Sequence, residues 1–347
     1  MKSFASDNIS AAHPAVMQAM ERANHGSAKP YGQDEWTEKA LAALQQTFGE
    51  TARPSFVMLG TAANVLGLKS MLQSHQAILC SDSSHIHVDE CGAPEAIIGC
   101  KIITTPSVNG KICLETCRAR LSMREAVHHS YPKVLSITQQ TESGTIYTIA
   151  ELQEIGRFCR ENKLYFHMDG ARLANAAAAL NVSLKAITAD VGVDVLSFGG
   201  TKNGLLMGEA VIFFNPELGQ EFHYLRKQHM QLTSKMRYIA AQFLAYLEND
   251  LWRTNAQAAN STAALLAQEL GTLDHVRFAF PVEGNALFVR MPKASLERLA
   301  KDYYFYIFDE EDGPGFPAGW AMARFLTAFD TTKEEVLAFA KAIALCK

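Results

Sequence analysis

The chain has 347 residues, which is long enough for two domains of ordinary size. Hydrophobic residues make up 48% of it and charged residues 20%, so a large core can form and extensive disorder is excluded. The net charge is −4, no polybasic segment is present, and no apolar run approaches the ~20 residues that cross a bilayer. We therefore expect neither a nucleic-acid partner nor a membrane-spanning segment.

The N-terminal segment and the cysteines indicate the compartment. Residues 1–8 lack the apolar core of a secretory signal, so we expect a cytoplasmic protein. Seven cysteines are scattered along the chain, an odd number that does not suit a disulfide framework. No Cys or His pair completes a structural zinc site with Cys113 and Cys117. We expect reduced thiols that pack as small core residues.

Helix and strand patterns alternate through the first two-thirds of the chain. Apolar residues at helical spacing predict a helix over 34–48, another after Gly60-Thr61, and a third that begins at the capping box formed by Thr148 and Glu151. Alternation of this kind predicts an α/β domain with a mostly parallel sheet, whose ligands bind at the carboxyl ends of the strands. The expected strands cover 55–59, 78–80, 134–137, 164–168, 193–198 and 211–214.

The pattern changes from about residue 246. A long helix rich in Ala, Leu and Gln is expected over Asn255–Leu270, and a terminal helix begins after Thr332. Alternating segments at 276–280, 286–289 and 303–308 lie between these helices. These features predict a smaller α+β domain, joined to the first by a helix around 230–248. We place the large domain at 1–245, including an N-terminal segment 1–14, and the small domain at 246–347.

Lys202 is the first candidate for chemistry. It follows a predicted strand in Gly199-Gly200-Thr201-Lys202-Asn203-Gly204, and small neighbours let its amine reach a bound aldehyde. A lysine serves for this purpose because its amine becomes nucleophilic when its pKa is lowered. Taken alone, the motif is equally consistent with a solvated or a phosphate-binding lysine.

Asp169 follows another predicted strand, in His167-Met168-Asp169-Gly170-Ala171-Arg172. A partly buried carboxylate beside a pyridine nitrogen keeps that nitrogen protonated, which makes the ring an electron sink. The alternative is that Asp169 caps the helix that follows. Because Lys202 comes 33 residues later at the next strand end, the two together favour pyridoxal 5'-phosphate as the cofactor.

Two further segments have residues suited to this cofactor. Gly60 and Thr61 lie where a strand passes into a helix, and a helix N-terminus there favours a phosphate. His85, in a loop, is suited to stack on the cofactor ring or to transfer a proton. His85 and His87 would also share one face of a strand, which raises a metal site as an alternative. No third ligand is evident nearby, so we predict no metal.

The remaining candidates are cationic. Arg172 and Arg324 each offer a planar guanidinium that can bind a carboxylate at two points, as an amino-acid substrate requires. An ordinary surface role for either arginine is the alternative.

Several separated motifs occur in a fixed order along nearly the whole chain, and their combination is more specific than any one of them. They are Phe4-Ala5-Ser6-Asp7-Asn8, Tyr31-Gly32-Gln33-Asp34, Gly60–Asn64, His85 with Asp89-Glu90, Thr138–Thr145, His167–Arg172 and Gly192–Gly204. In this combination the chain resembles the low-specificity L-threonine aldolases, which are fold-type-I pyridoxal-phosphate enzymes. The resemblance implies that fold, with a mostly parallel seven-stranded sheet in the large domain and a small α+β C-terminal domain.

The resemblance also implies site residues. Lys202 would bind the cofactor covalently, Asp169 would pair with its ring nitrogen, and His85 would stack on the ring. Gly60 and Thr61 would hold the phosphate, while Ser6, Arg172 and Arg324 would surround the substrate carboxylate, and Arg172 would also contact the cofactor. Members of the family are usually homotetramers with shared sites. The residues expected to reach across subunits are Tyr31, toward the substrate, Arg237, toward the cofactor, and Lys227.

The sequence departs from the family in one segment. Many members carry a glycine triplet before the Met-Arg pair, whereas Gln231–Lys235 precedes Met236-Arg237 here, and the spacing from Lys227 is longer. This is similar to a sub-branch that contains phenylserine aldolases. The implied activity is cleavage of L-threonine, L-allo-threonine and related β-hydroxy-α-amino acids to glycine and an aldehyde, with a phenylserine aldolase as the alternative.

The expected mechanism needs a base at the substrate's β-hydroxyl, for which His85 is the first candidate, with Glu90 behind it. Three other functions are less consistent with the motifs. A β-eliminating lyase of the same fold would release pyruvate and ammonia instead of glycine and an aldehyde. A catalytically idle cofactor carrier would not need Lys202, Asp169 and two carboxylate-binding arginines together. A nicotinamide dehydrogenase lacks its Gly-x-Gly-x-x-Gly motif here.

Overall fold

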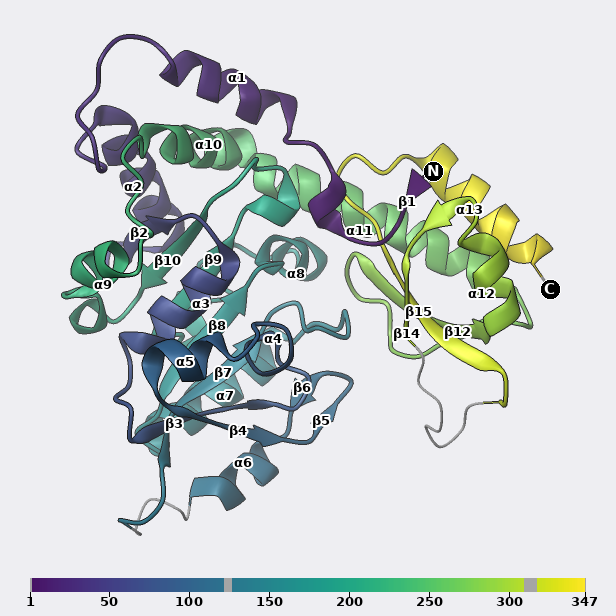
Figure 1. Ribbon diagram of the computed structural model, residues 1–347, viewed down its shortest axis with the longest axis horizontal. Coiled ribbons are helices and arrows are strands. Elements are labelled where there is room, and N and C mark those ends of the chain that lie inside the picture. Colours follow the sequence, from purple (N-terminus) through teal and green to yellow (C-terminus); the bar gives the residue numbers. More distant parts are fainter. Residues whose placement is uncertain (1, 122–126, 309–316, 347) are drawn as a thin grey trace.

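The computed structural model describes residues 2–121, 127–308 and 317–346. A seven-stranded sheet forms the centre of the larger part of the molecule (Figure 1). Its strands run parallel except β10, which is antiparallel to both of its neighbours. In spatial order they are β2 (Arg53–Val57), β10 (Glu209–Phe213), β9 (Val195–Gly199), β8 (Tyr165–Gly170), β7 (Tyr131–Thr138), β3 (Gln76–Ser81) and β4 (Lys101–Thr105). The mostly parallel seven-stranded sheet is therefore confirmed.

Helices cover both faces of this sheet. In β3, Ala77 and Leu79 belong to one buried cluster, whereas Ile78 and Cys80 belong to another on the opposite face. Successive strand side chains point to opposite faces, so a strand buried on both sides is apolar without interruption. The helices of this part are α1 (Pro14–Ala23), α2 (Glu35–Phe48), α3 (Gly60–Lys69), α4 (His85–Val88), α5 (Ala93–Ile98), α6 (Leu114–Leu121), α7 (Ile149–Glu161), α8 (Leu173–Leu180), α9 (Phe222–Gln228) and α10 (Arg237–Leu247).

Local sequence signals explain where two of these helices begin. The Asp34 carboxylate accepts a hydrogen bond from the Thr37 backbone at 2.9 Å, which caps α2. The predicted capping box at α7 is present, with Thr148 and Glu151 each accepting a backbone N–H from the other. By contrast, the N-cap of α3, Leu59, supplies no side-chain hydrogen bond. The N-terminus of α3 thus keeps donors for another partner.

A second, smaller sheet lies to one side, with helices packed against it (Figure 1). Its core is separate from those of the large sheet and includes Phe4 from the N-terminal segment. Its strands, in spatial order, are β11 (Arg277–Phe278), β12 (Ala286–Pro292), β15 (Trp320–Leu326) and β14 (Tyr306–Phe308). The helices of this part are α11 (Leu251–Leu270), α12 (Lys293–Leu299) and α13 (Lys333–Leu345). Two short strand pairs form separate sheets: β1 (Lys2–Ser3) with β13 (Tyr303–Tyr304), and β5 (Ser107–Val108) with β6 (Lys111–Ile112), which lie beside the large sheet (Figure 1).

Helix α11 connects the two parts (Figure 1). Its N-terminal half contributes Trp252 and Ala256 to the large core, and its C-terminal half contributes Ala263 and Leu266 to the small one. The division at 245/246 stays a prediction, since the same helix serves both cores. The N-terminal segment was predicted as part of the large domain. It begins with strand β1, which pairs with β13 of the predicted small domain.

The structure differs from the sequence prediction in several elements. Strand β15, which carries Arg324, was not predicted, although 321–326 is largely apolar. Strand β4 and the short helices α5, α6 and α9 were also missed. The long helix begins at Leu251, earlier than the predicted Asn255. None of the helices in the part of the chain that the structure describes is long and apolar enough to cross a membrane.

Candidate active site

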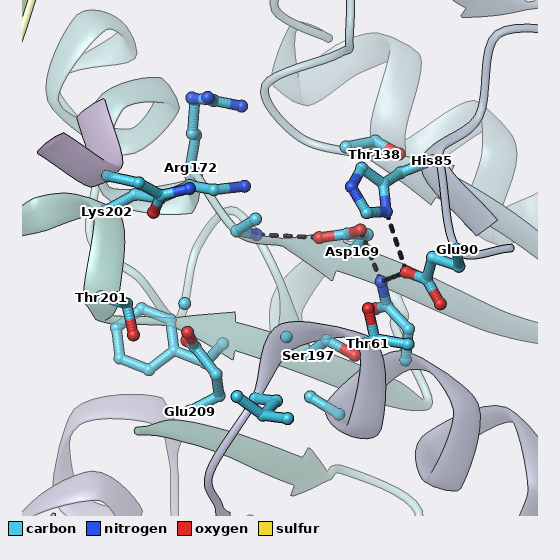
Figure 2. Close-up of a pocket in the computed structure, with 18 of the residues that line it drawn as sticks. Thr61, His85, Glu90, Thr138, Asp169, Arg172, Ser197, Thr201, Lys202 and Glu209 are labelled. Atoms are coloured by element: carbon cyan, nitrogen blue, oxygen red, sulfur yellow. Dashed lines mark hydrogen bonds and ion pairs between the residues drawn. The ribbon is translucent and has the colours of Figure 1, made fainter. Parts of the chain in front are cut away.

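A cavity of about 420 Å³ opens at the carboxyl ends of the central parallel strands (Figure 2). Thr138, Asp169 and Ser197 line it from three neighbouring strands, because Asp169 is paired in register with both of the others. The remaining walls come from the N-terminus of α3, the segment after β9, and β10. The cavity therefore lies at the strand edge where the sequence predicted a ligand.

Asp169 is the penultimate residue of β8 and is only 5% exposed. One of its oxygens accepts the backbone N–H of Ala171 at 2.9 Å, and the other accepts the Asn64 side-chain amide at 2.8 Å. Arg172, not Asp169, occupies the N-cap of α8. The alternative that Asp169 caps this helix is therefore wrong, and its carboxylate faces the cavity.

A hydrogen-bond chain joins Asp169 to His85 (Figure 2). The Asn64 amide nitrogen also donates to Oε1 of Glu90 at 2.8 Å, and Nδ1 of His85 lies 2.9 Å from the same oxygen. The hydrogen bond with Glu90 raises the pKa of His85, although burial lowers it. Glu90 is 4% exposed, so this pair is shielded from solvent on the carboxylate side.

The imidazole of His85 and the carboxylates of Glu90 and Asp169 lie close enough together to bind a metal ion. Ligand atoms of His85, Glu90 and Asp169 lie within 4.8 Å of one another. However, the Asn64 amide nitrogen lies 2.8 Å from an oxygen of each carboxylate, and its hydrogens fill the space between them. His85 also begins the helix α4, so the predicted strand face shared with His87 does not exist. We keep the prediction that no metal binds here.

Lys202 lies in a single 3-10 turn, Thr201–Asn203, that follows β9. Two hydrogen bonds hold this turn in place, because the Asn203 amide donates to the Tyr246 hydroxyl at 2.7 Å and to the Trp252 carbonyl at 2.8 Å. No hydrogen bond or ion pair joins the Lys202 amine to the residues that the structure describes. The positive charge of Arg172 and burial lower the pKa of Lys202. Its amine is thus more nucleophilic than a surface lysine.

Glu209 is a buried carboxyl at the base of this segment. It is the first residue of β10, lines the cavity, and accepts the Gly200 backbone N–H at 2.8 Å. Burial raises the pKa of Glu209 to about 7, although a hydrogen bond from Thr201, the bond from Gly200 and the charge of Lys202 lower it. Glu209 thus holds the backbone of the segment that leads to Lys202.

Glu142 supports His85 from the opposite wall. Its Oε1 accepts the Thr138 hydroxyl at 2.6 Å and the His85 backbone N–H at 2.7 Å. Burial raises the pKa of Glu142, and these two hydrogen bonds lower it. The start of α4, and with it the position of the imidazole, is tied to β7 through this carboxylate.

Arg172 is paired with Asp7. Its Nε and Nη2 donate to the two Asp7 oxygens at 2.6 and 2.9 Å, and Asn285 donates to one of them at 3.2 Å. Burial raises the pKa of Asp7, but Arg172 together with Lys202 and Asn285 holds it below its usual range. Two of the three guanidinium nitrogens are thus committed to Asp7, and Nη1 is left for another partner.

Gly60 and Thr61 form the wall at the N-terminus of α3. A Cβ built on Gly60 would have no heavy atom within 4 Å, so open space lies in front of its backbone. An uncapped helix N-terminus facing a cavity is suited to an anion, because its free N–H groups and the helix dipole both favour negative charge.

Five other predicted residues lie outside the cavity lining: Ser6, Tyr31, Lys227, Arg237 and Arg324. Ser6 accepts the Asn8 backbone N–H at 3.2 Å, which caps a turn within the N-terminal segment, and Arg324 donates to the Ala5 carbonyl at 3.2 Å, which ties this segment to β15. Their predicted contacts with a substrate stay predictions.

The residues predicted to cross between subunits lie together on the surface. The Lys227 amine lies 5.3 Å from the centre of the Tyr31 ring, and Arg237 donates to the backbone carbonyls of His25 and Gly26. Tyr31 is 46% exposed. Their contribution to a neighbouring site stays a prediction.

Sequence reasoning missed several residues of the site. Asn64 and Asp7 lie inside motifs that were noticed, but no role was assigned to them. A possible signal for Glu209 was its position as a carboxylate directly before the fully buried run 210–213. The other polar residues of the cavity without a predicted role are Asn8, Thr138, Gln140, Glu142, Ser197 and Thr201.

Comparisons with known proteins agree on one family. A model of the β-eliminating lyase family matches residues 3–294. The chain is 42% identical over 319 residues to a low specificity L-threonine aldolase of Pseudomonas sp. (strain NCIMB 10558), covering 91% of this chain and 92% of that protein. It is 40% identical over 344 residues to the protein of that name from Pseudomonas aeruginosa, covering 99% and 97%. The solved structure of Leishmania major threonine aldolase superposes with a TM-score of 0.93 at 29% identity, covering 100% of both chains.

Proposed function

Because the chain belongs to the β-eliminating lyase family and, within it, to the low-specificity L-threonine aldolases, we propose that it cleaves β-hydroxy-α-amino acids with pyridoxal 5'-phosphate. L-threonine and L-allo-threonine are the first substrates expected, and the products are glycine and an aldehyde. The observation that carries the proposal is that Lys202, Asp169 and the uncapped N-terminus of α3 line one cavity.

The residues present fit this cofactor. Its aldehyde needs an amine with a lowered pKa, which Lys202 offers without a competing hydrogen bond among the described residues. Its phosphate needs donors that no side chain already satisfies, and α3 offers them at Gly60 and Thr61. Its ring nitrogen needs a buried carboxylate held by neutral donors, and Asp169 is held in this way by Ala171 and Asn64.

When bound, the cofactor supplies an electron sink for the bonding pair of the cleaved Cα–Cβ bond. Asp169 would hold a proton at the ring nitrogen, where its negative charge favours the cationic form. His85 is proposed to remove the proton of the β-hydroxyl, because its imidazole lines the cavity and Glu90 orients it. A proton returned to Cα then completes glycine.

Arg172 is proposed to bind the substrate carboxylate. It lines the cavity, and its Nη1 stays available because Asp7 engages only Nε and Nη2. Because Asp7 already fixes one edge of the Arg172 guanidinium, the other edge can bind a carboxylate with little further loss of side-chain conformational entropy. Ser6, within the N-terminal segment, and Arg324, which binds that segment through the Ala5 carbonyl, are kept as further candidates for this subsite.

We also propose a homotetramer whose subunits share their active sites. Three large apolar residues at the cavity, Leu59, Leu206 and Met207, are 59%, 43% and 41% exposed. Apolar side chains grouped at the surface are typical of an interface. Analytical ultracentrifugation of the holoenzyme tests the assembly. The cytoplasmic location stays a prediction.

The proposed activity has a direct test. Purified protein is incubated with the cofactor and offered L-threonine, L-allo-threonine, their D isomers and phenylserine, and glycine and aldehyde are both quantified. We expect equal amounts of the two products from the L substrates and none from Lys202→Ala. Borohydride should attach the cofactor to a peptide containing Lys202. A protein that binds no cofactor, or that gives neither product, contradicts the proposal.

Two alternatives are distinguished by the same assay. The family model is described as a β-eliminating lyase, and that reaction would give pyruvate and ammonia in place of glycine and an aldehyde. A phenylserine aldolase, favoured by the residues before Met236, would give benzaldehyde faster than L-threonine gives acetaldehyde.

A further inference from the structure

Asn64 lies between Asp169 and Glu90 in the wall of the cavity. It belongs to α3, is 3% exposed, and its side-chain nitrogen donates to Asp169 and to Glu90 at 2.8 Å each. We propose that Asn64 is a positioning residue, whose amide holds Asp169 and Glu90 together as hydrogen-bond acceptors and so fixes the His85 imidazole with its Nε2 facing the cavity. This role deepens the proposed function and rests on it.

The chemistry of the amide decides the direction of every hydrogen bond in this chain. An NH₂ group only donates, so the oxygens that it contacts on Asp169 and Glu90 must both accept. The opposite orientation would place the amide carbonyl against two carboxylate oxygens, with no hydrogen between them. The Asn64 carbonyl oxygen itself is buried and has no hydrogen-bond partner among the described residues. Both carboxylates are therefore bound through one neutral donor.

The orientation of His85 follows from this arrangement. Oε1 of Glu90 accepts from Asn64 and lies 2.9 Å from Nδ1 of His85, so Nδ1 must carry a proton. The second ring nitrogen then holds the lone pair, and Figure 2 shows that it points away from Glu90 toward the cavity. A base for a substrate hydroxyl requires this tautomer.

Glu90 depends on Asn64 to remain in place. Its other oxygen, Oε2, is buried and unpartnered in the part of the chain that the structure describes. Without the Asn64 amide, the His85 ring would be the only donor to this buried carboxylate among the described residues. An ionised carboxylate that loses one of two donors is poorly held in a buried position.

The charged groups around His85 determine how substitutions of Asn64 should change the pKa of His85. Glu90 and Asp169 raise the pKa of His85, Lys202 lowers it, and Glu142 accepts its backbone N–H. Asn64→Ala weakens the hold on Glu90, so the pKa of His85 should fall. Asn64→Asp has nearly the same shape but adds a negative charge, so the pKa of His85 should rise. Any negative charge added near His85 raises this pKa, so the fall in Asn64→Ala is the result that a residue needed only for packing would not give.

The test is a titration of the His85 ring in ¹⁵N-histidine-labelled protein, with and without cofactor, its resonances assigned by their loss in His85→Gln. We expect an Nδ1-protonated neutral ring in the wild type, and shifts of roughly one pH unit downward in Asn64→Ala and upward in Asn64→Asp. The acidic limb of kcat/KM should move in the same two directions. In both variants kcat should fall by about tenfold or more, as expected when a general base is misplaced.

Matched controls are Asn175→Ala and Asn175→Asp. Asn175 is also 3% exposed, and its amide donates to Asn260 at 3.0 Å, away from the cavity. These variants should lower stability and leave the His85 titration unchanged. If Asn64→Asp does not fold, Asn64→Ala is made in a Glu90→Gln background, where it should shift the His85 titration no further.

The outcomes separate this inference from the proposed function. Shifts in the same direction for both Asn64 variants, no shift in either, or an Nε2-protonated ring in the wild type would overturn the role of Asn64. The titration uses no substrate, so a wild-type protein that forms no aldehyde would refute the aldolase activity and leave the result on His85 intact.

Discussion

Replacing Asp7 by asparagine tests the contact that sequence reasoning did not foresee. Asp7 binds Arg172 through two hydrogen bonds of 2.6 and 2.9 Å, and its side chain is 1% exposed. Asparagine has the same shape but only one acceptor oxygen, and its NH₂ group would face the donors of Arg172 or Asn285. The variant therefore breaks a buried ion pair and leaves the arginine charge without its partner.

The magnitude follows from burial. Removing one partner of a buried pair costs about 3–5 kcal/mol. The Arg172 side chain is 17% exposed and the asparagine oxygen can still accept one bond, so we expect about 2–3 kcal/mol. Unfolding entropy of about 2.1 cal/mol/K per residue gives about 0.7 kcal/mol/K for 347 residues, so Tm should fall by about 3–4 °C. KM should rise more than kcat falls, because Arg172 is no longer held in place for a carboxylate.

The assay is thermal unfolding as a function of pH, with Asp190→Asn as control. Asp190 pairs with Lys185 at the surface, where both side chains are about half exposed, and the same substitution there should change stability by less than about 1 kcal/mol. The folded pKa of Asp7 lies below 3.8, so its contribution is complete above that pH and disappears as pH falls through the folded pKa. Equal Tm values for Asp7→Asn and Asp190→Asn near pH 7 would refute the reasoning.

Three further predictions concern the cavity. Asp169→Ala should weaken cofactor affinity and lower kcat by at least about 100-fold, and normal activity in this variant would exclude its pairing with the ring nitrogen. Gly60→Val should weaken cofactor affinity with little change in Tm, because a side chain there meets open space instead of protein; a large loss of stability would show that Gly60 is needed for folding. Burial raises the pKa of Glu209 from 4.5 to about 7 in the folded protein. The wild type should therefore lose stability relative to Glu209→Gln as the pH rises through this range. The difference approaches about 3 kcal/mol above pH 7 in cofactor-free protein, and a constant difference across this range would mean that the Glu209 carboxyl is not neutral in the fold.

Part of the site could be predicted because its signals are local. Lys202 and Asp169 each follow an apolar run, so their positions at strand ends can be read within a few residues. The carboxyl ends of parallel strands meet at one edge, and that rule brings the two together in a single cavity. The comparisons confirm the predicted family. The family could be predicted because several such motifs in a fixed order are rare by chance.

Other local predictions failed where packing decides. Asp169 has the sequence position of an N-cap, but its carboxylate accepts bonds from Ala171 and Asn64. His85 was expected in a loop or on a strand face, yet it begins a one-turn helix held by Glu142. In each case a group from another element takes part: Asn64 donates to Asp169, and Glu142 accepts the His85 backbone N–H.

The sequence by itself determined the fold class and the family, and it indicated Lys202 and Asp169 as candidates at strand ends, because periodicity and strand-end motifs depend on near neighbours. Only the tertiary structure decided which groups meet. Arg172 pairs with Asp7 across 165 residues and Asn64 with Asp169 across 105. Such hydrogen bonds require partners placed within a few tenths of an ångström, and only the packing of whole strands and helices provides that placement.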